Sequence, residues 1–569
     1  MSSTPSPSPH LPTPSRPSRV RRLPLAGVLR PGKPSDIWFK PASSVVVATA
    51  IPNLTLLALG RLDLVMYTMA GSFCALYTHN LPYAARARAL AWVVAGMLAS
   101  VAVAMVTASL TTSAAVLVAV GALLAAAQKT LCDATRVGPP GHLIFTFISS
   151  ATLFAPQAIG QVPGHLALTL GAGAVAWLVG MAPALVRPHG PERRATARAL
   201  NAAAAYADAV YADAAGPGRE RARQGAAAAV HAAWQSLFAT GARTAARRAM
   251  ERLVIRAEDA LAEPSAADPA LLRTWAAGLR GTGAVPRPGD VRPDMDDELL
   301  GVEAELAAAS KGAKVASLWR RLGPGSPLLP IALRTAVGCA LAGYASLALG
   351  VGRPYWALVT AASLYQANVT LTWSRGVQRV VGNLVGVLAF AVIVPVAHLG
   401  HAALILCCLA LAFGAEALMG RNYWLGSVCV TPMALLVTEF ARFQQPGELM
   451  LDRIVDTLVG ALLGIAAAIA VTNRRAADHI ELAIDATDRA RAHAEQALSA
   501  PSRNPDTLRP ARRRLTAALV DLRTANDAAA GEWWQRALPE QRVMASEQAG
   551  HRTLAATVRG MANGERVRV

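Results

Sequence analysis

Twelve stretches of mostly apolar residues decide which folds this chain can adopt. A helix needs about 20 such residues to cross the hydrocarbon core of a bilayer. The first six stretches lie at about 43–60, 63–80, 89–107, 113–132, 142–160 and 167–187. The second six lie at about 327–350, 355–372, 380–398, 401–418, 423–440 and 454–472. The sequence therefore predicts an all-α polytopic membrane protein built from two six-span units.

The composition supports a membrane protein. Hydrophobic residues make up 53% of the 569 residues and charged residues only 16%, whereas an ordinary soluble domain carries about 25% charged residues. A single packed core stops growing beyond about 250–300 residues, so the apolar excess has to face lipid. Aromatic residues make up 5%, which argues against a stacking surface for nucleic acid. We therefore expect the lipid bilayer as a partner and no nucleic acid.

Polar segments divide the chain into five parts. Residues 1–42, rich in Pro, Ser and Arg, predict a disordered basic tail without the apolar core of a signal peptide. The two membrane units occupy residues 43–188 and 326–472. Residues 189–325 and 473–569 are rich in Ala, Arg, Glu and Asp, and predict two cytoplasmic helical regions. The first of these regions should form helices at about 192–214, 219–263 and 296–321.

Arginine and lysine gather in alternate loops between the predicted spans. They precede the first span and follow the second, fourth, sixth, eighth, tenth and twelfth. The loop at 398–401, on the opposite side, is nearly free of them. Because cytoplasmic loops of membrane proteins carry the excess of Lys and Arg, we expect a multi-pass plasma (inner) membrane protein with both termini in the cytoplasm.

The two units resemble each other around one turn. Gly60-Arg61, after the first span, aligns with Gly352-Arg353, after the seventh, and a span, a basic turn and a glycine-bearing span follow in both units. An even number of spans gives both units the same orientation, so we expect a parallel repeat about an axis along the membrane normal. Two such units can enclose a path on that axis.

The sequence contains none of the common enzyme motifs. It has no P-loop, no G-x-S-x-G motif and no His/Glu pair at the spacing of a metal site. Its six cysteines fall within or at the ends of apolar stretches, without the C-x-x-C spacing of a zinc site. We therefore expect that the chain is not an enzyme, with no catalytic residue, no metal and no cofactor.

Three arginines are candidate functional residues, because placing an ionisable side chain in a membrane span costs about 2.5–3.5 kcal/mol. Arg334 lies inside the seventh span, and Arg375 and Arg379 lie four residues apart at the start of the ninth. Together they predict a basic mouth that concentrates anions. The alternative is structural, because Arg334 can extend to the lipid headgroups and the other two can serve only as topology anchors.

Two carboxylates near the spans have two interpretations. Glu416 lies near Arg421 at the end of the tenth span, and Asp456 lies one turn after Arg453 in the twelfth. An ion pair with the neighbouring arginine is the simpler interpretation, and proton exchange is the functional one. Glycines at four-residue spacing predict close helix packing. These glycines are Gly382, Gly386, Gly460 and Gly464.

The second unit carries a series of motifs at characteristic spacing. They are Arg334-Thr-Ala-Val-Gly338, Pro354-Tyr-Trp-Ala-Leu, Arg375-x-x-x-Arg379-x-x-Gly382-Asn383-x-x-Gly386, Asn422-Tyr-Trp-Leu-Gly and Arg453-Ile-Val-Asp456-Thr457. Together they resemble the integral-membrane domain of the fusaric acid resistance (FUSC) family, which includes bacterial aromatic carboxylic acid exporters and is related to plant aluminium-activated malate transporters. The resemblance covers residues 327–472 well and the first unit loosely, where Ala42 or Ser43 takes the place of Arg334.

The resemblance implies export of small organic anions, above all aromatic carboxylates. In this family the proton gradient is the proposed driving force, and some members work with a periplasmic adaptor protein. By position, the resemblance assigns the anion-attracting groups to Arg334, Arg375 and Arg379, and the polar lining of the path to Asn383 and Thr431.

Two other functions stay open at this point. A passive organic-anion channel of the same architecture needs no proton carrier, whereas a coupled exporter would use Asp456 or Glu416. A membrane scaffold for assembly of the cell envelope would act through residues 189–325. The sequence also leaves open whether the chain forms a homodimer or binds an envelope adaptor protein.

Overall fold

The structure, a computed structural model, is entirely helical over the residues that it describes. These are residues 23, 25–32, 37–135, 137–212, 217–239, 244–281, 283–287, 328–366, 368–440, 443–471, 476–500, 505–530 and 539–567. They form helices, turns and loops, with no strand among them. The predicted all-α class is thereby confirmed, and the helix expected at 296–321 lies outside the described residues.

Eight helical segments of the described residues are long and apolar enough to cross a membrane. In the first membrane unit they are α1 (Phe39–Ala58), α3 (Tyr83–Leu110), α4 (Ala114–Thr135) and the stretch Ile159–Val186, which contains α6 (Val162–Met181) and α7 (Pro183–Val186). In the second unit they are α14 (Leu329–Ala348), α16 (Val369–Ala397), α17 (His401–Met419) and α19 (Pro446–Ala470). These segments establish a multi-pass membrane protein.

The other four predicted spans are shorter than expected. They correspond to Leu62–Leu76 around α2 (Val65–Ser72), α5 (Leu143–Leu153), α15 (Tyr355–Leu364) and α18 (Tyr423–Val437). At 1.5 Å per residue, a helix of 10–15 residues covers about half to three quarters of a bilayer core of about 30 Å. The expectation of twelve full-length spans is therefore wrong, although apolar helices occupy all twelve predicted positions.

One boundary error changes where two candidate arginines lie. The sequence predicts a span from about residue 380, but α16 begins at Val369. Asn368 fixes this start, because its side-chain oxygen accepts a hydrogen bond from the Leu371 amide at 2.9 Å. Arg375 and Arg379 consequently lie within the second and third turns of a long helix rather than in a basic turn before it.

The order of long and short helices is the same in both units, and α1 and α14 end in the same way. Each has 20 residues, followed by a glycine with positive φ, +65° at Gly60 and +72° at Gly350. The next amide in each unit donates to the carbonyl five residues before it, Arg61 to Leu56 and Val351 to Ser346, in a Schellman-type cap. Gly60 therefore corresponds to Gly350, not to Gly352. In this register Ser44, not Ala42 or Ser43, is the counterpart of Arg334, since each is the sixth residue of its helix.

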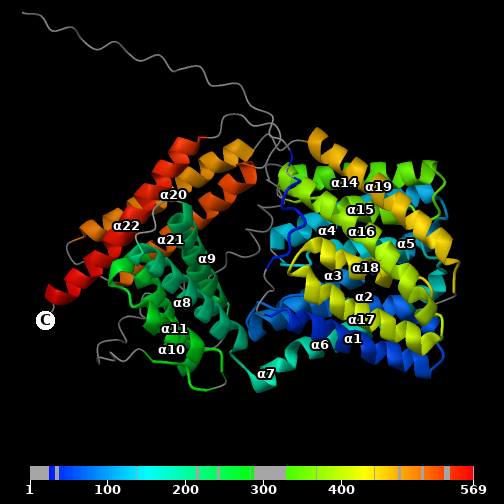
Figure 1. Cartoon of the computed structure of the whole chain (residues 1–569), viewed down its shortest axis with the longest axis horizontal. Coiled ribbons are helices and arrows are strands. Elements are labelled where there is room, and N and C mark those ends of the chain that lie inside the picture. Colours follow the sequence, from blue (N-terminus) through cyan, green and yellow to red (C-terminus); the bar gives the residue numbers. More distant parts are fainter. Residues whose placement is uncertain are drawn as a thin grey trace, which may run out of the picture.

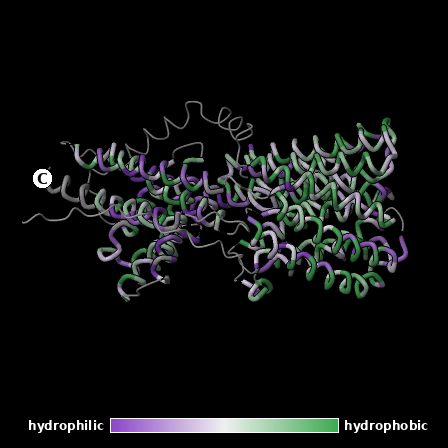
Figure 2. Tube along the Cα trace, turned by 90° about the horizontal axis from the view of Figure 1, so that it is seen from above, coloured by the Kyte–Doolittle hydropathy of each residue, from purple (hydrophilic) through white to green (hydrophobic). Residues whose placement is uncertain are grey.

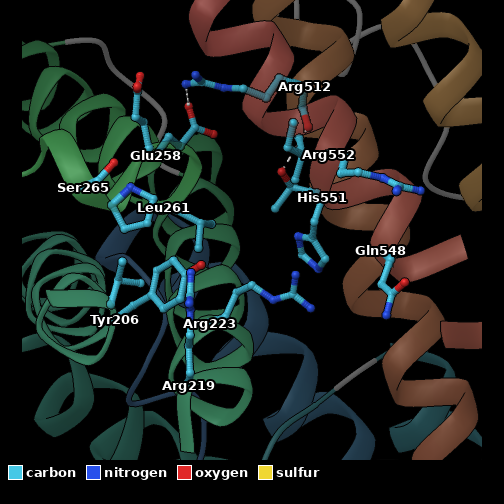
Figure 3. Close-up of a pocket in the computed structure, with 15 residues that line it drawn as sticks. Tyr206, Arg219, Arg223, Glu258, Leu261, Ser265, Arg512, Gln548, His551 and Arg552 are labelled. Atoms are coloured by element: carbon cyan, nitrogen blue, oxygen red, sulfur yellow. Dashed lines mark hydrogen bonds and ion pairs between the residues drawn. The ribbon is translucent and has the colours of Figure 1, made fainter. Parts of the chain in front are cut away.

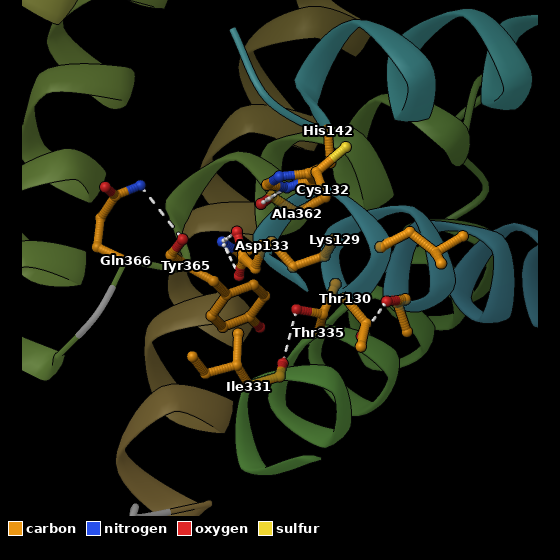
Figure 4. Close-up of polar contacts among 12 residues, drawn as sticks. Lys129, Thr130, Cys132, Asp133, His142, Ile331, Thr335, Ala362, Tyr365 and Gln366 are labelled. Carbon is orange, nitrogen blue, oxygen red and sulfur yellow. Dashed lines mark hydrogen bonds and ion pairs between the residues drawn. The ribbon is translucent and has the colours of Figure 1, made fainter. Parts of the chain in front are cut away.

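The contacts between the two units are reciprocal. The first helix of each unit packs on the fourth helix of the other, α1 on α17 and α14 on α4. Tyr344 of α14 donates a hydrogen bond to the Ala115 carbonyl of α4 at 3.1 Å, and Trp38 meets Phe413 edge to face. Figure 4 shows the second of these junctions, where His142 of the first unit hydrogen-bonds the Ala362 carbonyl of the second at 3.1 Å.

Among the described residues, seven further helices form a separate polar bundle. They are α8 (Gly190–Tyr211), α9 (Pro217–Phe238), α10 (Ala245–Ala262) and α11 (Pro269–Gly278), then α20 (Ala476–Ser499), α21 (Pro505–Ala530) and α22 (Glu540–Val567). Figure 1 shows this bundle beside the membrane bundle of α1–α6 and α14–α19, and Figure 2 shows apolar residues dominating only the membrane bundle. The single helical stretch expected at 219–263 is two helices, α9 and α10, and α11 was not predicted.

Part of the tail predicted to be disordered packs on the second membrane unit. The Val28 carbonyl accepts hydrogen bonds from Gln378 of α16 at 2.9 Å and Asn422 at 3.0 Å. The Trp424 indole donates to the Leu29 carbonyl at 2.9 Å. We call residues 25–32 the strap. The prediction of disorder is wrong for these residues because it considers only the composition of the tail. The hydrogen-bond donors that hold the segment belong to α16 and α18, which lie far along the chain.

Candidate functional site

Two of the predicted arginines meet on one tyrosine. The Arg375 guanidinium lies 4.0 Å from the centre of the Tyr423 ring, and Arg379 donates a hydrogen bond to the Tyr423 hydroxyl at 3.1 Å. Asn422 caps α18 and holds Tyr423 as its first residue. Because Arg375 and Arg379 lie one turn apart on α16, the two positive charges face the same side chain of α18.

One turn further along α16, a buried amide joins three helices. Asn383 donates to the Thr457 hydroxyl of α19 at 3.0 Å and accepts a hydrogen bond from Thr431 of α18. All three side chains are buried. Glycines make the approach possible, because a Cβ at Gly386 would lie 2.7 Å from the Thr431 Cβ. Asn383 and Thr431, which the resemblance assigns to a polar lining, are therefore in direct contact.

A further buried arginine of the second unit, Arg453, was not among the predicted anion-binding residues. Arg453 of α19 is 1% exposed, and its guanidinium lies 5.2 Å from the centre of the Trp356 ring. Its Nε and Nη1 atoms are buried without a hydrogen-bond partner, as is Nε of Arg379. The two arginines are within electrostatic reach of each other. An arginine inside an apolar span was the available signal, but its spacing to Asp456 made an ion pair the simpler interpretation.

A fourth arginine also contacts Trp356. The Arg353 guanidinium is 5.2 Å from the centre of the same indole ring, and it pairs with Asp452 at 3.5 Å and donates to Gln444. We call these four side chains the arginine row: Arg375, Arg379, Arg453 and Arg353. The row follows α16 and α19 through the second membrane unit.

Asp456 lies beside this row without the ion pair that the sequence predicts. Its side chain is fully buried, Oδ1 accepts a hydrogen bond from Ser346 of α14, and Oδ2 has no hydrogen-bond partner. No salt bridge within 4.0 Å links it to Arg453 in the part of the chain that the structure describes. The interpretation of an intrahelical pair is therefore wrong. One turn further, Gly460 packs against the Ala357 carbonyl, which leaves no room for a Cβ.

The expected ion pair of Glu416 is also absent from the described residues. Glu416 lies on α17, which packs on α1, and it is within electrostatic reach of Tyr77. Its counterpart in the first unit is Lys129, since each is the sixteenth residue of its helix. Lys129 pairs with Asp133 at 2.8 Å, and Figure 4 shows this pair beside Tyr365. Both side chains thus lie at junctions between the units rather than in the arginine row.

Arg334, the third predicted arginine, bonds to the last turn of the second unit. Arg334 is 1% exposed, and its Nε donates to the Val471 carbonyl at the end of α19. This bond joins α14 to α19, next to the Gly338–Tyr365 contact. The convergence of Arg334, Arg375 and Arg379 on one basic mouth stays a prediction.

The first unit has no equivalent of the arginine row. Its sixth helix, α6, carries no Arg, Lys, Asp or Glu, and its one ionisable side chain is His165. His165 stacks on Tyr67 at 3.8 Å between ring centres. The two units thus share a fold, but the buried arginine of the first unit, Arg86, lies in the first turn of α3 and bonds to His79 at 2.9 Å.

A separate cavity of about 650 Å³ lies in the polar bundle. Figure 3 shows Arg223 of α9 and His551 of α22 facing it, with the Arg512–Glu258 ion pair at its edge. Burial opposes the charge on Arg512, but Glu258 and Asp259 outweigh it and raise the pKa of Arg512 above its usual range. Within the described ranges no three His, Cys, Asp or Glu side chains are placed to hold a metal ion.

Over the described residues, the fold and this site define an all-helical, multi-pass membrane protein with a row of arginines in the second of two related units. Residues 340–467 match the family described as fusaric acid resistance protein-like, the family that the second membrane unit resembles in sequence. Over 173 residues the chain is 30% identical to a Bacillus subtilis (strain 168) protein described as uncharacterized membrane protein YvaC. The aligned part is 30% of this chain and 26% of that relative, so the chain spans about a quarter of the relative's length. No solved structure matches the chain.

Proposed function

We propose that this protein is a transporter that exports organic anions, above all aromatic carboxylates, across the plasma (inner) membrane. The observation that carries the proposal is the pair of buried guanidinium groups of Arg379 and Arg453, whose free N–H groups lie within the second unit. Cations in a membrane interior are costly and mark ion or substrate pathways. The family match supports a transporter rather than an enzyme.

The chemistry of the row favours a carboxylate attached to a ring. A guanidinium group binds a carboxylate through charge-assisted hydrogen bonds, often two at once. Trp356 and Tyr423 lie next to these guanidinium groups and supply flat apolar faces. A small aromatic acid would satisfy both kinds of group, with its charge on Arg379 or Arg453 and its ring on a neighbouring aromatic side chain.

The orientation of the proposed path follows from the charge of the loops. Arg375 and Tyr423 lie near the strap at the end where the predicted loops are basic, and Arg353 lies near Gln444 at the opposite end. Basic loops face the cytoplasm. On this orientation both termini and the polar bundle are cytoplasmic, and an anion meets Arg375 first and Arg353 last.

The proposal is tested by measuring anion flux in proteoliposomes. The probe is radiolabelled 4-hydroxybenzoate, and the variant is Arg453→Gln, which keeps hydrogen-bonding capacity but removes the charge. Loss of a buried partner for a carboxylate costs about 2–5 kcal/mol, so we expect the initial rate to fall at least about tenfold.

The matched control is Arg421→Gln, which removes the same charge from an exposed position. It should transport at the wild-type rate, and the melting temperatures of both variants should stay close to that of the wild type. Wild-type transport by a folded Arg453→Gln protein would exclude the arginine row as the path of the anion.

A further inference from the structure

A basic cavity of about 570 Å³ lies where the first membrane unit meets the polar bundle. Its walls come from the start of α1, the loop after α7, the start of α8 and the segment 279–285. Six basic side chains line it: Lys40, Arg187, His189, Arg193, Arg194 and Arg280. None of its described lining residues is Asp or Glu. This cavity is separate from the arginine row, which lies in the other unit.

The positive charges of this cavity are only partly compensated. Arg193 donates to the carbonyls of Gly281, at 3.0 Å, and Gly283, which fixes the wall formed by that segment. Lys40 lies within electrostatic reach of Arg86, Arg187 and Arg194. In the described part of the chain neither Lys40 nor Arg187 has a carboxylate within 4.0 Å. Like charges held together in this way favour an anion between them.

Two other features of the site change its electrostatic field. The 22-residue helix α8 begins at the cavity with Gly190, so its positive dipole end adds to the field. Glu192, in the first turn of α8, is buried and lies 3.9 Å from His189. It offsets one of the charges without lining the cavity, so a positive excess remains.

Exposed apolar side chains border the same cavity. Phe39 of α1 is 47% exposed, and Val186, at the end of α7, is 75% exposed. The neighbouring Leu185 is 90% exposed. Large apolar groups that face outward beside a basic pocket are typical of a lipid-binding position, with acyl chains on one side and a headgroup on the other.

We propose that this cavity binds a phosphate group, carried by an anionic phospholipid of the adjoining leaflet. The phosphate lies between Lys40 of α1 and Arg187 and Arg194 on the other side, and the acyl chains pass over Phe39 and Leu185. A bound headgroup thereby links the first membrane unit to α8. The binding does not depend on anion transport, since none of these residues belongs to the arginine row.

The test uses the full-length protein purified in detergent, with lipid binding followed by native mass spectrometry and by melting temperature. Added phosphatidylglycerol should give one tightly bound lipid per chain and raise the melting temperature, and phosphatidylcholine should do neither. Inorganic phosphate and sn-glycerol 3-phosphate are tested in the same way as soluble probes. Weaker protection by these soluble probes identifies a lipid headgroup, and equal protection identifies a free phosphate in the same site.

The variant is Lys40→Gln/Arg187→Gln, and we expect its affinity for phosphatidylglycerol to fall at least tenfold. Its control is Arg88→Gln/Arg421→Gln, which removes the same charge from two exposed arginines outside the cavity. The single variant Arg187→Gln, at an exposed position, serves if the double variant does not fold. Equal loss in variant and control, or no binding of any phosphate by the wild type, overturns the proposal.

Discussion

At the scale of single residues, the interior of the second unit keeps opposite charges close without pairing them. Arg453 and Asp456 lie on neighbouring turns of α19, yet the first faces Trp356 and the second accepts from Ser346. Each retains buried polar atoms without a partner. A buried polar atom without a partner destabilises the fold unless a ligand or a proton satisfies it. In the proposed transport, the anion satisfies Arg453 and a proton satisfies Asp456.

The role of Asp456 separates a proton-coupled exporter from a passive channel. In a coupled exporter, Asp456→Asn removes the proton carrier, so the imposed pH gradient no longer accelerates anion flux, while flux down the anion gradient continues. Flux of 4-hydroxybenzoate in proteoliposomes, with and without a pH gradient, measures this effect. If the wild type itself responds only to the anion gradient, the passive channel is the correct alternative.

Part of this site was predictable from the sequence. Arg375, Arg379, Asn383 and Thr431 follow from charge in a span and from the family motifs, and they lie in contact with one another or with Tyr423. The position of Arg453 was not predictable, because spacing along one helix says nothing about competing partners on α14 and α15. Trp356 and Ser346 supply those partners from distant parts of the chain.

At the scale of helices, small residues decide how closely the second unit packs. A Cβ at Gly382 would lie 2.6 Å from the Ser427 Cβ, and one at Gly460 would lie 2.8 Å from the Thr360 Cβ. These contacts join α16 to α18 and α19 to α15. Close backbone approach is how helices associate in lipid, where no hydrophobic force brings them together.

Gly460→Ala should therefore destabilise the protein. Because the added methyl meets the Ala357 backbone, one helix has to shift, and overpacking of this kind costs about 1–3 kcal/mol. The melting temperature in detergent measures the loss. The control is Gly171→Ala on α6, where nothing lies within 4 Å of the new Cβ. The packing argument is wrong if the two variants have the same melting temperature.

Helix existence was predictable, but helix length was not. Apolar runs reveal which segments enter the membrane, since hydropathy is a property of composition. They do not reveal the capping residues that decide where a helix begins. Asn368 starts α16 eleven residues before the expected position at 380, and a hydrogen bond of one side chain outweighs the pattern of its neighbours.

At the scale of the whole molecule, the polar bundle joins two groups of helices that follow different membrane units. In the described residues the first group is α8–α11 and the second is α20–α22, and the groups pack together through α9 on α21 and α10 on α22. Arg512 of α21 joins the groups through Glu258 at 2.6 Å and Asp259 at 3.2 Å. Glu258 is 5% exposed, so this contact is a buried ion pair.

Arg512→Gln should separate the two groups. Removing one partner of a buried pair leaves Glu258 uncompensated and costs about 3–5 kcal/mol. Limited proteolysis of the full-length protein should then cut the loops around α9 and α21 faster than in the wild type. The neighbouring Arg514 is exposed, and Arg514→Gln should leave the cleavage rate unchanged. Unaltered proteolysis of Arg512→Gln would mean that other contacts hold the groups together.

The strap has a consequence for how the protein is made. Val28 and Asn422, which it joins, lie 394 residues apart. A ribosome therefore releases residues 25–32 long before α16 and α18 are made, and the strap cannot dock until synthesis has passed Trp424, which has 145 residues after it. Docking on Gln378 and Trp424 thus follows synthesis of α18, and a nascent chain cut short before α18 leaves residues 25–32 without these partners.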